Sequence, residues 1–304
     1  MERRFFLLLI SSLMIAATFL ISSCGEGGNG LNRTANKLTL DTIHIESRRH
    51  LGGDTANPYC DIRLHVIYPI DSEGTNLDTL QRYFVTALFG PAYHNLKPTA
   101  AIEEYVRNYE ENYSRDAAIY HENAGSAVTS DPVVQDDVQV HDYEGLSTAD
   151  SFYSYYESIS DTIFYNQHGI ISFQVRQSNN KGGATSYQLC RNHVFNLRQE
   201  APVTENELFK AGYDTALRNI LIASLLEQNG VKSIDELEEL GFFGIREILP
   251  NKNFLLNDKG IVYTFNKGEY SAYQLDAQEI MIPYGSIRSL LRENSVASKL
   301  ADLK

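Results

Sequence analysis

The side chains that could carry out chemistry in this sequence include eight histidines, three cysteines and 39 carboxylates. Their spacing matches none of the common metal or nucleophile motifs: there is no H-E-x-x-H, C-x-x-C, calcium-loop or G-x-S-x-G pattern. Cys190 and His193 lie three residues apart on an expected strand, so their side chains should point to opposite faces. His44 and His65 lie on strands that could pair with each other. The sequence therefore predicts no metal, no cofactor and no catalytic residue.

One cysteine does stand in a pattern with a specific chemistry. Residues 1–23 contain two arginines near the start, continue with an apolar run, and end in two serines directly before Cys24. Charge, apolar core and small residues in this order predict a secretory signal peptide, and the run is short for a membrane span. A cysteine in this place is the lipobox pattern, in which the thiol receives a diacylglycerol. We expect a lipid at Cys24 to anchor the chain in the cell envelope, at the outer membrane, facing the periplasm or the cell surface.

The other two cysteines, Cys60 and Cys190, both lie in strand-like segments. An oxidising compartment permits a disulfide between them. Sequence does not show whether their Cα atoms come within the roughly 7 Å that a disulfide requires. Two separate buried thiols are the favoured alternative.

The charge of the chain limits its class of partner. The sequence carries 39 acidic and 26 basic residues, a net charge of −13, and it stays negative when the expected signal is removed. A negative chain is poorly suited to nucleic acid, because phosphate binding depends on lysine and arginine. A cationic partner is favoured instead, since complementary charges speed encounter.

The elements that would position any site begin after a glycine-rich tether at residues 24–37. Residues 38–120 read as an N-terminal α+β subdomain, in which strands at 38–45 and 62–68 precede helices that start near 77 and 98. Residues 121–150 are rich in Asp, Gly and Pro and predict a linker or insert. The chain is long enough for a sizeable core.

Residues 151–304 predict a second α+β domain. Strands at about 151–165, 170–178 and 186–197 are joined by short turns, which predicts an antiparallel meander. Capping boxes at 204–207 and 233–236 start helices, and a longer helix at 214–228 lies between them. A hairpin at 254–265 and a strand at 279–284 follow. We therefore expect an α+β fold, an antiparallel sheet with helices packed on one face, in two cooperating subdomains.

This second block resembles a known family. The similarity rests on the glycine turn at 182–183, the hairpin at 254–265 and the Ile282-Pro283-Tyr284 strand end. It is similar to the extracytoplasmic domains of unknown function DUF3298 and DUF4163 found in lipoproteins of the Bacteroides group. Such a domain occurs in the lysozyme-binding part of anti-sigma factor V and beside peptidoglycan deacetylase C. The resemblance implies a protein-binding module preceded by a smaller domain.

The sequence also departs from that family. The glycine turn commonly continues Ala-His, whereas Thr185 follows Ala184 here, so any role of that histidine is absent. We therefore expect neither deacetylase activity nor a sigma-binding segment in this chain. With these departures, the resemblance and loop chemistry suggest a binding edge at five residues of two loops. The candidates are Lys181, Gly182, Gly183, Tyr270 and Tyr273.

Together these features predict a membrane-anchored cell-envelope binding module without catalysis. Its partner would be a cationic protein, of which a lysozyme-like muramidase is the most specific form, or an envelope glycan. The alternative is an enzyme acting on peptidoglycan or another glycan through two carboxylates that only the fold would bring together.

The lipid anchor gives a direct prediction. In the variant Cys24→Ala the acylated thiol is missing, so metabolic labelling with a radioactive fatty acid should leave the protein unlabelled. The product should then be a precursor or a soluble secreted form. Label retained by the Cys24→Ala protein would show that the lipid is attached elsewhere or that the lipobox is not used.

Overall fold

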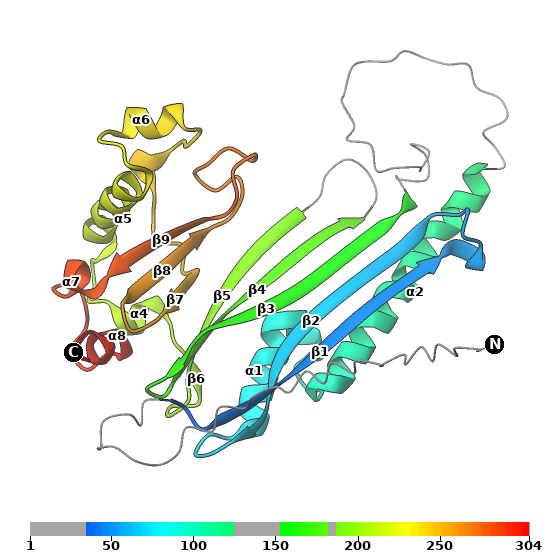
Figure 1. The fold of residues 1–304 in the computed structure, drawn as a ribbon, viewed down its shortest axis with the longest axis horizontal. Helices are drawn as coiled ribbons and strands as arrows, with labels where there is room; N and C mark the ends of the chain where they lie inside the picture. Colours follow the sequence, from blue (N-terminus) through cyan, green and yellow to red (C-terminus); the bar gives the residue numbers. More distant parts are fainter. Residues whose placement is uncertain (1–34, 125–152, 182–186, 304) are drawn as a thin grey trace, which may run out of the picture. The chain divides into compact units, whose positions relative to one another are not determined.

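Six strands form the larger of two β-sheets in the computed structural model, which describes residues 35–124, 153–181 and 187–303 (Figure 1). Their order in the sheet follows their order in the chain. Residues 38–72 and 155–202 thus contribute to one sheet, and the predicted boundary at 121–150 falls between its second and third strands. The strands are β1 (Leu38–His50), β2 (Tyr59–Ser72), β3 (Tyr155–Gln167), β4 (Ile170–Lys181), β5 (Tyr187–Asn196) and β6 (Ala201–Pro202), with a short helix η1 (Leu51–Gly53) after β1.

This sheet is mixed, because β2 and β3 run parallel from Cys60 opposite Tyr155 to His65 opposite Ser160. The other neighbours are antiparallel, including the predicted meander β3-β4-β5. The expectation of an antiparallel sheet is therefore wrong for this one pair. Parallel neighbours need a long crossover connection, and the chain between β2 and β3 supplies helices for it. They are α1 (Leu77–Phe89), η2 (Pro91–Tyr93) and α2 (Pro98–Ala124).

The end of α2 also corrects the predicted linker. The helix continues to Ala124, so the segment 121–150 starts inside a helix and not in a loop. The rest of that segment, 125–150, lies outside the described residues, as do the predicted signal peptide and Cys24.

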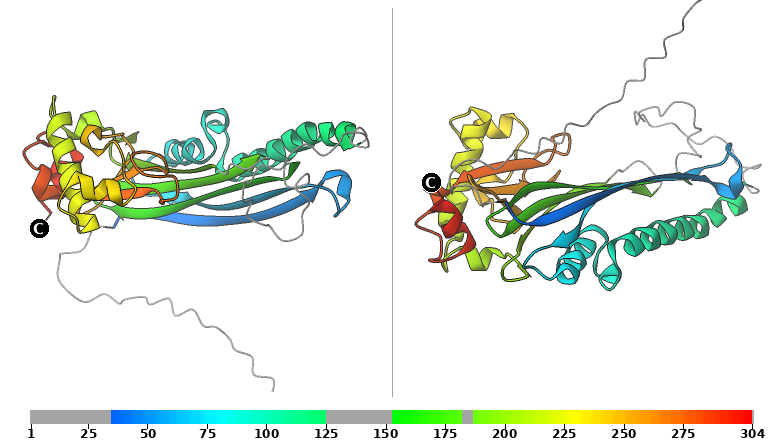
Figure 2. Two further views of the ribbon diagram at one scale, coloured as in Figure 1. Left: turned by 90° about the horizontal axis from the view of Figure 1, so that it is seen from above. Right: turned by 60° about the horizontal axis from the view of Figure 1, so that its bottom comes forward.

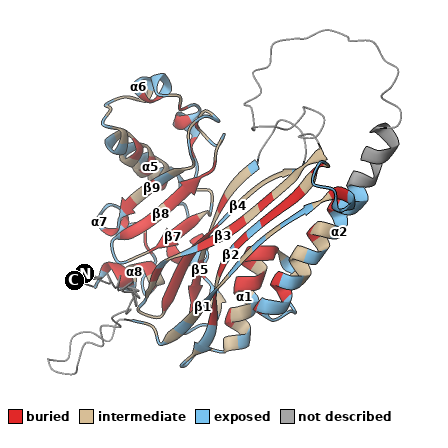
Figure 3. Ribbon diagram, turned by 45° about the vertical axis from the view of Figure 1, so that its right-hand side comes forward, coloured by how far each residue is buried: buried red, intermediate tan, exposed pale blue. Residues whose placement is uncertain are grey.

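Helices α1 and α2 both cover one face of the sheet, which we call the helix face (Figure 2). Alternate residues of β2 point toward them and are buried, as the alternation in the sequence predicts (Figure 3). Phe84 of α1 stacks on Phe173 of β4, with 4.2 Å between the ring centroids. The predicted stripe of α2 packs on the same face. Its members are Ile102, Tyr105, Val106, Tyr109 and Tyr113.

The last third of the chain builds a smaller antiparallel sheet around the predicted hairpin. The side chain of Asn257 accepts hydrogen bonds from the backbone amides of Lys259 and Gly260, which closes the turn. Only glycine fits at position 260, because a Cβ there would collide with the carbonyl oxygen of Ile282. The elements are α4 (Glu205–Leu208), α5 (Asp214–Asn229), α6 (Ile234–Glu239), η3 (Ile245–Glu247), β7 (Phe254–Leu256), β8 (Gly260–Phe265), β9 (Gln278–Pro283), α7 (Tyr284–Ile287) and α8 (Val296–Ala301).

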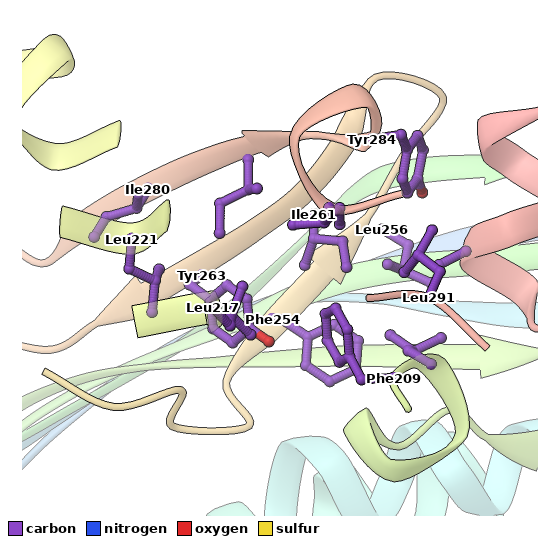
Figure 4. Packing of buried hydrophobic residues seen from close by; sticks show 14 of the residues in the cluster. Phe209, Leu217, Leu221, Phe254, Leu256, Ile261, Tyr263, Ile280, Tyr284 and Leu291 are labelled. Atoms are coloured by element: carbon purple, nitrogen blue, oxygen red, sulfur yellow. The ribbon is translucent and has the colours of Figure 1, made fainter. Parts of the chain in front are cut away.

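The core of this region lies between the small sheet and the helices around it (Figure 4). Leu217 and Leu221 of α5 are fully buried there against Tyr263 and Ile280. The helix ends where Gly230 adopts a left-handed conformation, the predicted stop signal. The predicted capping box forms at Thr204. At Ser233 the hydroxyl caps the helix by accepting from the N–H of Glu236, whose carboxylate accepts from the N–H of Lys232 instead of that of Ser233. The α+β class is therefore confirmed.

Asparagine side chains join the two sheets along β5. The backbone N–H of Asn192 donates to Asn253 Oδ1 at 2.7 Å, and Asn253 Nδ2 donates to the carbonyl oxygens of Cys190 and Thr264 at 3.0 and 2.8 Å. The N–H of Cys190 donates to Asn266 Oδ1 at 2.7 Å. These bonds provide partners for backbone groups on β5 that would otherwise need a neighbouring strand. We call this set the asparagine clamp.

The two remaining cysteines are both free and buried. Cys60 packs in the core of the helix face, where burial raises the pKa of its thiol to about 12. Cys190 packs where β5 meets the small sheet. The favoured alternative of two separate thiols is thus confirmed. Within the described residues, no helix is both long enough and apolar enough to cross a membrane.

The clamp predicts a stability effect at one residue. Asn253→Ala removes the acceptor of Asn192 N–H and the donor to Cys190 and Thr264, so buried backbone groups lose their partners. We expect urea unfolding to show a loss of roughly 2–4 kcal/mol, because each orphaned buried group costs about 1–3 kcal/mol. Asn229→Ala is the matched control, since Asn229 bonds only a carbonyl one turn earlier in α5. Equal losses in the two variants would contradict the proposed importance of the clamp.

Candidate binding surface

The structure separates the five predicted binding residues into different environments. Lys181 is the last residue of β4, and Gly182 and Gly183 after it lie outside the described residues. Tyr270 and Tyr273 lie in the loop between β8 and β9.

Lys181 takes part in the packing of the helix face. Its ammonium lies 6.0 Å from the centroid of the Tyr109 ring of α2. Its charge also favours the ionised form of Glu157, opposing the burial that raises the pKa of that carboxyl. The lysine thus has a local role that needs no ligand.

Tyr270 is chiefly a packing residue as well. Its backbone has a φ of 58°, and its ring meets Phe265 of the small-sheet core edge to face at 5.6 Å. Its carbonyl oxygen accepts a hydrogen bond of 3.0 Å from the N–H of Phe243. That bond links the β8–β9 loop to the segment that follows α6.

Two further contacts make these loops one surface. Ala272 N–H donates to the carbonyl of Gly241 at 2.7 Å, and Phe242 forms a β-bridge with Ser271. Gly241 and Gly244 have φ of 95° and 65°, which lets the segment turn sharply on either side of the two phenylalanines.

Large apolar side chains project from this pair of loops. Leu240 is 48% exposed, Phe243 49% and Tyr273 52%, whereas Phe242 beside them is buried. Exposed apolar groups that gather on one part of a surface commonly mark a site of interaction, and the backbone contacts between the two loops bring these three residues into one region. Gly268 precedes this tyrosine with a φ of 80°, a conformation that favours glycine, and a Cβ there would lie in ordinary contact with the ring of Tyr273 at 3.5 Å.

Carboxylates are frequent in α6 and in the two loops that carry these apolar groups. Lysine and arginine neutralise only some of them: Arg246 pairs with Asp235 at 2.6 Å, and Lys267 pairs with Asp276 at 3.2 Å. We call the whole region the acidic–aromatic surface. It comprises Leu240, Phe243 and Tyr273 with Asp235, Glu236, Glu238, Glu239, Glu247, Glu269 and Asp276.

The binding edge predicted from the sequence includes Tyr273 but not Leu240 or Phe243. The available signal was the pair of phenylalanines between Gly241 and Gly244, a turn-like segment with more apolar residues than a turn needs. The sequence does not show which phenylalanine is buried, because the β-bridge at Phe242 that decides it comes from a distant loop.

Two buried carboxyl groups on β3 can be compared with the carboxyl pair of a glycoside hydrolase. Glu157 accepts hydrogen bonds from Tyr105 at 3.0 Å and Gln177 at 2.8 Å, and Asp161 accepts one from the backbone N–H of Ile67 at 2.7 Å. Four residues apart on β3, they are separated by about 13 Å at 3.3 Å per residue. Glycoside hydrolases hold their two carboxyl groups about 5–9.5 Å apart. The pair does not have that geometry.

The candidate histidines contact other rings in the large sheet and its helices. His44 and His65 lie opposite each other on β1 and β2, with ring centroids 6.0 Å apart. His193 lies between Tyr83 and Phe173 on the helix face, away from Cys190, and burial lowers its pKa to about 4. Among the residues that the structure describes, no group of three His, Cys, Asp or Glu side chains could hold a metal ion.

Comparisons with known proteins match the region that contains this surface. Residues 206–285 match the family model described as "Protein of unknown function (DUF3298)". The chain is similar to the crystal structure of a DUF3298 family member from Bacteroides fragilis NCTC 9343. Sequence identity is 25% and the TM-score is 0.75, over 88% of this chain and 99% of that one.

A DUF3298 family protein from Pseudomonas aeruginosa PAO1 shares the fold at 12% identity and a TM-score of 0.53, over 84% of this chain and 96% of that one. A search of curated proteins finds no match. The fold is thus a two-sheet α+β arrangement, and residues 206–285 match the DUF3298 model. This match confirms the predicted resemblance to DUF3298 proteins.

Asp161 gives a pH prediction. It is 3% exposed, its Oδ2 lacks a partner among the described residues, and burial raises its pKa from 3.8 to about 7. Between about pH 4 and 7 the unfolded chain releases this proton and the folded chain keeps it, so Asp161 lowers stability as pH rises. Asp161→Asn keeps an acceptor for Ile67 and should unfold at higher urea than wild type at pH 8, by on the order of 2 kcal/mol. The gain should vanish near pH 4; a gain that is independent of pH would contradict this account.

Proposed function

We propose that this chain is a lipid-anchored binding protein of the cell envelope that captures a cationic protein on the acidic–aromatic surface. The observation that carries the proposal is the exposure of Leu240, Phe243 and Tyr273 on two joined loops that are rich in carboxylates. Apolar and aromatic anchors supply most of the affinity of protein interfaces, and charged rims guide the encounter. A basic partner with an exposed apolar patch fits both requirements.

The net charge and the domain architecture support the same partner. The chain carries a net charge of −13, so its long-range field also attracts basic proteins. The resemblance to a lysozyme-binding domain favours a lysozyme-like muramidase as the specific partner, with the Cys24 lipid holding the chain at the outer membrane. An envelope glycan is the alternative ligand, because aromatic rings could stack on its sugars. The buried carboxyls described above give no support to a glycan-cleaving enzyme.

The test compares lysozyme binding by wild type and by the double variant Phe243→Ser, Tyr273→Ser in biolayer interferometry. Loss of two exposed anchors should weaken binding at least about tenfold, since a single anchor is often worth more than 1 kcal/mol. Phe164→Ser is the matched control, because Phe164 of β3 is 48% exposed and lies outside the surface. Its affinity should equal that of wild type.

Salt provides an independent reading of the same interaction. Raising sodium chloride from about 50 to 300 mM should weaken binding mainly by slowing association, because exposed charges are screened at this ionic strength. Binding that is equally strong in the double variant would overturn the proposed surface. Binding of peptidoglycan fragments but not of lysozyme would move the proposal to the glycan ligand.

A further inference from the structure

The two edges of the large sheet differ in how far their backbone groups have hydrogen-bond partners. The β5 edge is occupied by β6 and by the asparagine clamp. At the other edge, β1 runs for 13 residues, and among the described residues no strand pairs with its outer side. A long unpaired edge presents a row of backbone donors and acceptors, which is a ready template for another strand.

A groove follows this free edge. It encloses about 910 Å³ between β1 with η1 on one side and α2 on the other. Within it, Glu110 of α2 accepts a hydrogen bond from Ser47 and pairs with Arg49, each at 2.9 Å. The hydroxyl of Tyr113, which is buried in the wall of the groove, has no partner among the described residues. In the ribbon views α2 runs alongside β1 (Figures 1 and 2).

The charges along β1 are arranged so that the strand complements itself. In an antiparallel pair of two β1 strands with Ser47 opposite Ser47 of a second copy, Glu46 of each copy lies opposite Arg48 of the other. Opposite charges at directly facing positions stabilise antiparallel pairs, and like charges destabilise them. Arg48 already gives one donor to Asp61 at 2.5 Å and keeps further donors for this contact.

The groove side of α2 has the same property about nearly the same point. Besides Glu110, which is held by Ser47 and Arg49, its charged lining residues form a row in the order Glu103, Arg107, Glu111, Arg115. When the helix is laid antiparallel to its own copy with Tyr109 at the centre, Glu103 faces Arg115 and Arg107 faces Glu111. Because Glu110, next to Tyr109, bonds to Ser47, one twofold axis satisfies both the strand and the helix.

We propose that two copies of this chain pair through β1, forming one sheet that continues across a twofold axis at Ser47, with the α2 helices on the same side. A twofold interface uses the same patch on both copies, which is the self-complementary pattern seen here. The occupant of the groove is thus a second copy, whose β1 and α2 side chains enter it. This inference is independent of the proposed ligand of the acidic–aromatic surface.

A cysteine on the axis tests the geometry. In the Cys24→Ser chain without its signal, Ser47→Cys should crosslink to a disulfide dimer under mild oxidation, since facing residues of an antiparallel pair lie about 4.5–5.5 Å apart. Thr42→Cys on the same strand is the matched control and should crosslink at least about tenfold more slowly, because only the axial residue faces its own copy. Cys60 and Cys190 are buried and should not interfere.

Charge reversal tests the helix contacts. Arg107→Glu should raise the dimer dissociation constant measured by analytical ultracentrifugation at least about fivefold, and adding Glu111→Arg should restore it, because the swap recreates both facing pairs. Circular dichroism confirms that each variant is folded. A wild-type chain that stays monomeric at about 100 µM, or a Ser47→Cys protein that crosslinks no faster than Thr42→Cys, would overturn the proposal.

Discussion

The structure depends on how the backbone groups at the outer edge of β5 find hydrogen-bond partners. A strand near the edge of a sheet must find partners for every second N–H and C=O. Strand β6 pairs only with Phe195 and Asn196, and amide side chains of Asn253 and Asn266 bond to β5 backbone groups beyond it. Because these asparagines belong to the small sheet and its loops, the same bonds fix that sheet against the large one. Ser172 adds a bond to the Leu256 carbonyl at 2.7 Å. The loops that carry the acidic–aromatic surface extend from the region held in this way.

Polar residues inside the large sheet mark places where strand pairing changes. The parallel ladder of β2 and β3 ends at His65. Two residues later, the N–H of Ile67 donates a hydrogen bond to the side chain of Asp161. A carboxyl there satisfies the backbone at the cost of being buried, which is why its pKa rises. Glu157 is held similarly by Tyr105 and Gln177 at the helix face. Buried carboxyls in this fold are explained by sheet geometry before any catalytic role is considered.

The molecule presents two surfaces with different physical characters. The acidic–aromatic surface combines exposed rings with unneutralised carboxylates and suits a basic partner of another kind. The β1 edge has alternating charges and unpaired backbone, which suits its own copy. Since the two surfaces lie on different sheets, pairing through β1 uses none of the residues assigned to ligand capture, and each copy of a pair would keep its own binding surface.

Local signals in the sequence determined most individual elements. Periodicity set the inner faces of α1 and α2, N-cap side chains at Thr204 and Ser233 started two helices, and Asn257 with Gly260 fixed the hairpin. These features depend on residues a few positions apart, so sequence suffices for them. The similarity to DUF3298 domains was readable for the same reason, because it rests on the hairpin and strand pattern.

Tertiary structure decided what depends on distant residues. The parallel pairing of β2 with β3, the placing of Tyr270 against Phe265, and the choice between Phe242 and Phe243 as the exposed ring all follow from contacts across the chain. Sequence patterns show which residues prefer burial or a strand, but partners are chosen by the packing of whole elements. The binding surface is such a product, since its two loops are some 25 residues apart and meet only in the fold.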